Sequence, residues 1–224
     1  MGKRSTVELP AGTFSYFEEG TGPSLVFLHA LGRSATDWAP VTDRLSRNWR
    51  CIALDQRGHG ESVRCDHYSF EAMEKDLRAF VDSLGLDRFS LVAHSMGANV
   101  AWLFATRTPG RLERLVIEDT APPSPDRTHP EPPEHPGEPV SFDWNAARQI
   151  ISQLNRPDPD RWNDLTKVTA PTLLISGSAN DDLLNAVHAT LPDGQLIEIE
   201  VGHHIHQTAP GEYSSSVERF LRGE

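Results

Sequence analysis

The sequence has few cysteines, no excess of basic residues and no long apolar run. Its 224 residues include only two cysteines, Cys51 and Cys65, which cannot supply the several bridges of a disulfide-stabilised scaffold. The 21 lysines and arginines are outnumbered by 32 aspartates and glutamates, and the resulting net charge of −11 repels phosphate backbones. No apolar run approaches the roughly 20 residues that span a bilayer. We therefore expect no nucleic-acid partner and no membrane insertion.

The composition is that of a folded domain of moderate size. Hydrophobic residues make up 38% of the chain and charged residues 24%, which favours a packed core over disorder. At roughly 100–200 residues per domain, the length fits one large domain or one domain with a modest insertion. No apolar segment follows Lys3 and Arg4, so no secretory signal is predicted and the expected location is the cytoplasm.

Short apolar runs recur along the chain and predict the strands of a sheet. Each is too short for a helix and rich in strand-forming residues. Their nearly continuous apolar character is typical of strands that are buried on both faces of a parallel sheet. The runs cover 24–29, 50–55, 89–94, 112–118, 172–176 and 196–199.

Helical patterns lie between these runs. Over 69–84 the apolar residues step by three and four, with Ser69 as the predicted N-cap and Gly85 as the stop. Strands that alternate with helices indicate βαβ units with right-handed crossovers. The predicted class is therefore α/β, with a mostly parallel central sheet flanked by helices. Further helices are expected over 98–105, 182–191 and 211–221.

One segment interrupts this alternation. Residues 121–139 contain eight prolines among nineteen residues, which excludes a helix or an inner strand. A weaker helical pattern follows over 142–154. We predict that residues 122–163 form a short cap and that residues 1–121 and 164–224 form the core, the alternative being an exposed loop without a role in function.

Four apolar residues of the predicted cap are candidates for the wall of a binding pocket. They either face a ligand or only seal the cap helix onto the sheet. Trp144 is the candidate ligand contact among them. The four are Trp144, Ile150, Ile151 and Leu154.

The strongest chemical signal is the stretch Val92-Ala93-His94-Ser95-Met96-Gly97, which follows a predicted buried strand and opens a predicted helix. This is the context of a nucleophile elbow, where a sharp turn lifts a serine above the strand ends. The strand and the helix approach closely there, so small residues are needed on both sides of the serine. Gly97 meets this need, while Ala93 adds one methyl group at a position where glycine is usual. Ser95 is therefore the predicted nucleophile.

A serine hydroxyl needs a base to remove its proton, and a third group to orient that base. His203 directly follows Gly202 after the last predicted strand and is the candidate base. The adjacent His204 and His206 suggest a metal site, but no carboxylate or cysteine accompanies them at ligand spacing. We therefore predict no metal and no cofactor.

Attack of the serine on a carbonyl creates an oxyanion, which needs two preorganised backbone donors. One is expected in the turn that leaves the 24–29 strand, where Ala30 precedes Leu31. The second is expected directly after the nucleophile. The predicted pair is the backbone N–H of Leu31 and that of Met96.

Five motifs in this order make the chain resemble the serine α/β-hydrolase superfamily, from about residue 14 to the C-terminus except for the proline-rich segment. The resemblance implies a serine hydrolase that cleaves a small-molecule ester, thioester or lactone through an acyl-enzyme on Ser95. It also implies a purely structural role for the turn over 55–62. The motifs are His29-Ala-Leu-Gly, Asp55-Gln-Arg-Gly-His-Gly-Glu-Ser62, Ala93-His-Ser-Met-Gly97, Pro171-Thr-Leu-Leu-Ile-Ser-Gly177 and Gly202-His203.

The third member of the catalytic triad is where the sequence departs from the superfamily pattern. The usual acid lies three residues after the glycine that ends the next-to-last strand, and here that residue is Asn180. Asp181 follows it and is one candidate. Asp119, at the end of the 112–118 strand, is the other candidate. The resemblance supports it, because one class of haloalkane dehalogenases has its catalytic acid at the end of the corresponding strand. Glu118 is excluded, since side chains alternate along a strand and it points away from Asp119.

Two other functions fit the same residues. A non-hydrolytic enzyme of this fold (a cyclase, an acyl transferase or a carbon–carbon hydrolase) would use the same serine. The displaced acid instead favours a ligand-binding protein that has lost catalysis.

Overall fold

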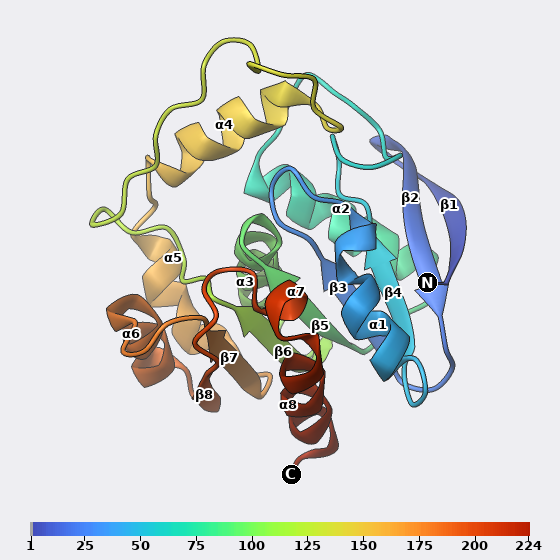
Figure 1. Ribbon diagram of the computed structural model, residues 1–224, viewed down its shortest axis with the longest axis vertical. Coiled ribbons are helices and arrows are strands. Elements are labelled where there is room, and N and C mark those ends of the chain that lie inside the picture. The colour runs from blue at the N-terminus through green and yellow to red at the C-terminus, as the bar shows by residue number, and fades with distance from the viewer. Residues whose placement is uncertain (1) are drawn as a thin grey trace.

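An eight-stranded sheet forms the centre of the computed structural model, which describes residues 2–224 (Figure 1). The strand order is β1-β2-β4-β3-β5-β6-β7-β8. The pairs β1–β2 and β2–β4 are antiparallel and the other five pairs are parallel. The predicted class, a mostly parallel α/β fold, is confirmed. The bounds are β1 Lys3–Leu9, β2 Gly12–Glu19, β3 Ser24–Leu28, β4 Arg50–Leu54, β5 Phe89–His94, β6 Leu112–Glu118, β7 Thr172–Ser176 and β8 Gly194–Glu198.

The antiparallel hairpin of β1 and β2 lies outside the predicted set of strands. Strand β1 is an edge strand whose residues are mostly exposed or half-buried. Its sequence is mostly polar, with Val7 and Leu9 as the apolar residues, and so has no continuous apolar run. Each of the six predicted strands corresponds to an observed one, with ends that differ by at most two residues.

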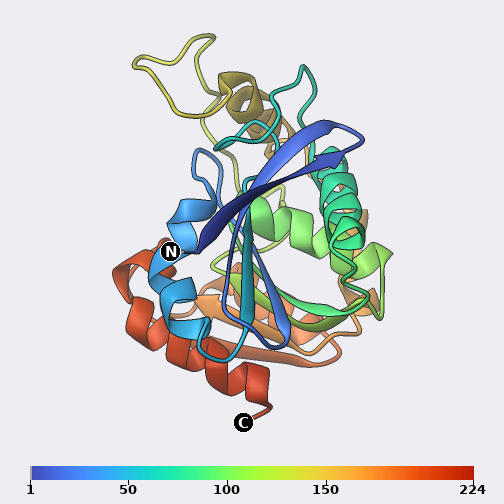
Figure 2. The ribbon, with the colours of Figure 1, turned by 90° about the vertical axis from the view of Figure 1, so that its right-hand side faces the viewer.

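Helices cover both faces of the sheet (Figure 2). Helices α2 (Phe70–Ser83) and α3 (Met96–Arg107) pack on one face with α6 (Asp182–Thr190). Helices α1 (Ala39–Leu45) and α8 (Pro210–Arg222) cover the other. Side chains of β3 alternate between the two cores, with Val26 and Leu28 on the first side and Leu25 and Phe27 on the second.

Helix α2 begins where its sequence predicts. The Ser69 hydroxyl accepts a hydrogen bond from the Ala72 N–H at 3.1 Å and so caps the helix. The helix ends at Ser83, and Gly85 follows with a φ of 65°, a left-handed conformation that favours glycine. Helix α1 was not predicted from the sequence. The short helical segments are η1 Ala35–Trp38, α5 Asp160–Asn163, η2 Asp164–Lys167 and α7 Ile205–Thr208.

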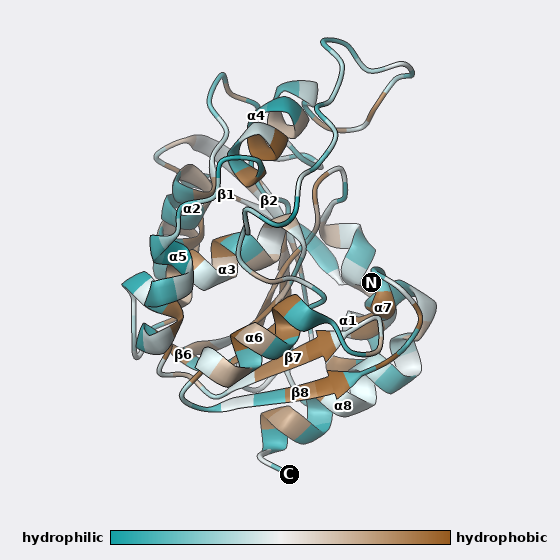
Figure 3. Cartoon of the chain, turned by 90° about the vertical axis from the view of Figure 1, so that its left-hand side faces the viewer, coloured by the Kyte–Doolittle hydropathy of each residue, from teal (hydrophilic) through white to brown (hydrophobic). Residues whose placement is uncertain are grey.

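The segment after β6 leads to helix α4 (Trp144–Leu154), which lies at the top of Figure 1. Residues 122–143 form neither helix nor strand. The Asp143 carboxylate caps α4 at the Asn145 N–H and also accepts a bond from the Tyr68 hydroxyl at 2.7 Å. Helix α4 turns hydrophobic residues toward the rest of the chain (Figure 3) and buries Ile150 completely. The Asp143–Tyr68 bond holds the start of α4 against the residues just before α2.

No helix within residues 2–224 is both long enough and apolar enough to cross a membrane.

Candidate active site

Ser95 occupies the turn between β5 and α3 in a strained conformation. Its φ is 52° and its ψ is −114°, which a non-glycine residue adopts only when its surroundings impose it. The backbone N–H of Ser95 donates to the Thr120 hydroxyl at 3.0 Å. A Cβ atom at Gly97 would lie 2.6 Å from the Leu28 carbonyl oxygen, so only glycine fits there. This is the geometry of a nucleophile elbow.

His203 lies against the carboxylate of Asp119. Nδ1 of His203 is 2.7 Å from Oδ2 of Asp119, and the other oxygen accepts a bond from the Gly177 N–H at 2.7 Å. Burial alone would raise the pKa of Asp119, but the bonds from His203 and Gly177 outweigh it and hold the pKa below its usual value. The carboxylate is therefore ionised at neutral pH.

Asp181, the alternative acid, has a different position. It is the N-cap of α6, where its Oδ1 accepts bonds from the backbone N–H groups of Leu183 and Leu184, both at 3.0 Å. Asn180 beside it donates its backbone N–H to Glu198. The structure therefore brings Asp119, and not Asp181, to His203.

The two predicted oxyanion donors border one cavity. Leu31 and Met96 both line it, and within residues 2–224 neither backbone N–H has an acceptor. Ala30 is buried and does not line the cavity, but its carbonyl accepts bonds from the Arg33 N–H and from the ring of His29. The Leu31 and Met96 amides are thus unused donors at the cavity.

Buried side chains hold the turn that carries Leu31. His29 Nε2 accepts a bond from the Gln56 N–H at 3.0 Å, and His59 Nε2 accepts one from the Gly32 N–H at 3.1 Å. Burial lowers the pKa of His29 to about 4 and that of His59 to about 3, so both rings are neutral and can accept. Asp55 accepts the Ala35 N–H at 2.7 Å. The turn over 55–62 therefore supports the oxyanion turn.

The cavity has a volume of about 470 Å³ and includes Ser95 and His203 in its lining. Within residues 2–224 no hydrogen bond joins the Ser95 hydroxyl to His203, and bonds of this kind often tighten only when substrate binds. The apolar wall of the cavity comes from α4 and α6. Apart from the predicted catalytic residues, polar side chains of its lining come from α3 and the proline-rich segment. The apolar wall includes Ile150, Ile151, Leu154 and Leu183, and the polar groups include Asn99, Arg127 and His129.

Trp144, the predicted aromatic contact, does not reach this cavity. Its indole N–H donates to the Pro133 carbonyl at 2.9 Å, on the side of α4 that faces the proline-rich segment. A second hollow of about 600 Å³ lies between α4, that segment and the start of α2. It contains none of the predicted catalytic residues.

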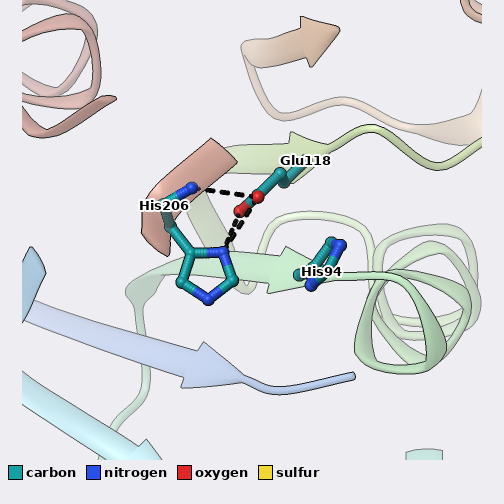
Figure 4. A group of neighbouring side chains, drawn as sticks. All are labelled: His94, Glu118 and His206. Atoms are coloured by element: carbon teal, nitrogen blue, oxygen red, sulfur yellow. Dashed lines mark hydrogen bonds and ion pairs between the residues drawn. The ribbon is translucent and has the colours of Figure 1, made fainter. Parts of the chain in front are cut away.

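A buried group of His94, Glu118 and His206 lies near the active site (Figure 4). Their potential metal-ligand atoms lie within 4.8 Å of one another, so folding supplies the carboxylate that the local sequence around His206 lacks. Both ring nitrogens of His206 are already engaged, one with Glu118 and one with Asp37. Only His94 has unpaired ring nitrogens. The group is therefore arranged as an ion pair between His206 and Glu118 beside a neutral histidine, and of its ring nitrogens only those of His94 are free.

The sequence and its fold have counterparts among known proteins. A family model described as the alpha/beta hydrolase fold matches residues 23–165. The chain belongs to this family. Among curated relatives, the mouse (Mus musculus) sn-1-specific diacylglycerol lipase ABHD11 is 38% identical over 106 residues, which cover 46% of this chain and 34% of that protein. A fluoroacetate dehalogenase of a Burkholderia species is 32% identical over 126 residues, or 54% of this chain and 41% of that protein. The matched stretches thus span well under half of these hydrolases.

Solved structures of this hydrolase family match over nearly the whole chain. The enol-lactonase from Burkholderia xenovorans LB400 superposes with a TM-score of 0.84 at 18% identity, covering 97% of this chain and 100% of that one. A thermophilic esterase from Thermogutta terrifontis gives 0.83 at 23% identity, with 99% of both chains covered. At these identities the likeness establishes the fold.

Proposed function

We propose that this α/β-hydrolase is a serine hydrolase that cleaves a small-molecule carboxylic ester, thioester or lactone. The observation that carries the proposal is the bond between Asp119 and His203 at the cavity that Ser95 lines. The apolar wall from α4 and α6 suits an acyl chain, and a 470 Å³ volume is within the ordinary range for small-ligand pockets.

The proposed reaction begins with the proton on His203. Because Nδ1–H of this ring donates to Asp119, Nε2 is unprotonated and accepts the proton of the Ser95 hydroxyl. The Ser95 oxygen then attacks the substrate carbonyl, and the backbone N–H groups of Leu31 and Met96 stabilise the oxyanion. The ionised Asp119 stabilises the imidazolium.

The intermediate collapses by expelling the alcohol or thiol. His203 returns its proton to this leaving group, which leaves the acyl chain esterified to Ser95. A water molecule loses its proton to His203 and attacks the acyl-enzyme. The acid product departs and Ser95 regains its hydroxyl proton.

Two alternatives to hydrolysis are another enzymatic reaction of the acyl-enzyme and ligand binding without catalysis. An acyl transferase or cyclase would use another nucleophile in place of water. A binding protein without catalysis needs no carboxylate on the far nitrogen of His203, so the Asp119 contact favours an enzyme. The cytoplasmic location stays a prediction of the sequence.

A fluorophosphonate probe tests the nucleophile. We expect the probe to label the wild-type protein and not Ser95→Ala, because it reacts with a serine only when a base activates it. Ser215→Ala is the matched control, since Ser215 is exposed on α8 and outside the cavity. A folded wild-type protein that stays unlabelled would overturn the proposal. Esters of graded acyl length then define the substrate.

A further inference from the structure

His206 sits between two buried carboxylates. Its Nδ1 lies 2.8 Å from both oxygens of Glu118, and its backbone N–H donates to the same carboxylate at 3.1 Å. Its Nε2 lies 3.2 Å from Oδ2 of Asp37. The side chains of His206 and Glu118 are fully buried and that of Asp37 is 7% exposed. Figure 4 shows the ring directed at Glu118.

The number of protons on this ring follows from the number of its acceptors. A neutral imidazole carries one N–H and could donate to only one carboxylate, while its other nitrogen would turn a lone pair toward the second. An imidazolium donates to both. Within residues 2–224 no lysine or arginine forms an ion pair with Glu118 or Asp37, and an unpaired buried carboxylate is costly.

The neighbouring groups agree with a positive charge at this position. The indole of Trp38 stacks on the ring, with centroids 4.2 Å apart, an arrangement that favours a cation. Burial alone would lower the pKa of His206, but the bonds to Asp37 and Glu118 raise it to about 9. The other titratable or charged groups that face His206 or its two partners are His94 on β5, His204 just before α7, Tyr213 on α8, and His29 and Arg33 beside Asp37.

The three partners lie in three segments that carry the proposed catalytic groups. Glu118 immediately precedes Asp119 at the end of β6, and His206 lies three residues after His203. Asp37 belongs to η1, which follows the turn that contains Leu31. The Asp37 carboxylate also accepts a bond from the side chain of Gln207. One buried ring thus joins the segments of the acid, the base and the oxyanion donor.

We propose that His206 is a positioning residue. As a permanent imidazolium at neutral pH, it holds these three segments in fixed positions relative to one another. It touches no reacting atom. Its catalytic effect rests on the proposed hydrolase function, whereas its protonation state does not. Losing the charge would leave two buried carboxylates facing each other and would let the three segments separate.

The protonation state is measured on the wild-type protein by long-range ¹H–¹⁵N correlation of ¹⁵N-labelled histidine rings. Of the ten histidines, one is expected to keep both ring nitrogens protonated at pH 8 (about 1.5 units above the ordinary histidine value) and to titrate near pH 9. Asp37→Asn should move this titration to lower pH, which assigns it. If every ring has lost its second proton by that pH, the proposal is wrong.

The positioning role is measured with His206→Gln, which keeps hydrogen-bonding groups but carries no charge. We expect its kcat and its rate of Ser95 labelling to fall about 10- to 100-fold with KM little changed, because small displacements of catalytic groups are costly. We expect the kcat of wild type to fall above about pH 9, where His206 loses its proton, and this fall should be absent from the variant. The matched control is His67→Gln, since His67 is exposed outside the site.

The outcomes separate the two proposals. A wild-type protein that shows no labelling refutes the hydrolase function and leaves the ring titration as a test of the imidazolium. A labelled wild type with an equally active His206→Gln refutes the positioning role. If His206→Gln does not fold, Asp37→Asn carries the kinetic test, and an unchanged kcat and pH profile in that variant contradicts the role.

Discussion

The Asp119 carboxylate lies 2.7 Å from Nδ1 of His203, although 84 residues separate the two in sequence. Because the ionised Asp119 can only accept a hydrogen bond, this contact favours a proton on Nδ1, which leaves Nε2 of the neutral ring free to accept another. It also distinguishes the two aspartates of the sequence, since Asp181 uses its carboxylate to cap α6. The proposed mechanism depends on this one bond more than on any other.

Replacing the two aspartates by asparagine separates their roles. Asp119→Asn should lower kcat by about 10³- to 10⁴-fold, because an amide cannot stabilise the imidazolium and favours the wrong tautomer. Asp181→Asn should leave kcat within about twofold, since asparagine caps a helix as well as aspartate does. Steady-state ester hydrolysis by both variants checks this. Equal losses would mean that Asp119 has no special role.

Gly97→Ala should destabilise the fold. The added methyl group would meet the Leu28 carbonyl at 2.6 Å, and this overpacking should cost about 1–3 kcal/mol of the free energy of unfolding. Gly137→Ala is the control, because a Cβ there meets nothing within 4 Å, and its effect should stay within about 0.5 kcal/mol. Urea unfolding measures both. A Gly97→Ala variant as stable as wild type would show that α3 and β3 are not in close contact.

Arg127 should favour substrates that carry a negative charge. It is exposed at the cavity that contains Ser95, and no ion pair within residues 2–224 involves its side chain. For an anionic ester relative to its neutral analogue, Arg127→Gln should reduce kcat/KM about two- to fivefold, the size expected for an exposed charge pair. Arg148→Gln, in the second hollow, is the control. The same loss on both esters would exclude a charge effect.

Stability should fall as pH rises through the range in which His206 loses its proton. Its pKa is raised from 6.5 to about 9, so its contribution is complete below pH 6.5, decreases above it and is gone above about pH 9. The free energy of unfolding of wild type should therefore decline over this range by a few kcal/mol, on the order of what such a shift supplies. His206→Gln should show a flatter profile. Parallel profiles for the two proteins would contradict the charged ring.

Local sequence patterns predicted the features that depend on neighbouring residues. The apolar runs indicated the inner strands, Ser69 indicated the start of α2, and the small residue at Gly97 indicated the elbow. Each of these signals arises from contacts within one element or between adjacent ones. The β1–β2 hairpin was missed because β1 is mostly exposed or half-buried and polar residues interrupt the apolar ones in β2, so neither strand has an apolar run.

The features that the sequence left open or missed depend on which loops meet in space. The choice between Asp119 and Asp181 rests on how the loop after β7 folds, and the role of Trp144 rests on which side of α4 faces the cavity. Glu118, His206 and Asp37 come from three distant segments, so no spacing in the sequence marks them. Their only sequence signal was a carboxylate within an apolar strand and a histidine beyond the candidate base, neither of which names its partner.

Mass spectrometry of the protein, quenched during turnover of a reactive acyl ester, would detect the proposed acyl-enzyme itself. We expect a transient gain of the acyl mass on the peptide that contains Ser95. This gain should be absent in Ser95→Ala and should form much more slowly in Asp119→Asn. A folded wild-type protein that hydrolyses the ester with no acyl group on Ser95, or with the acyl group retained in Ser95→Ala, would contradict the proposed mechanism.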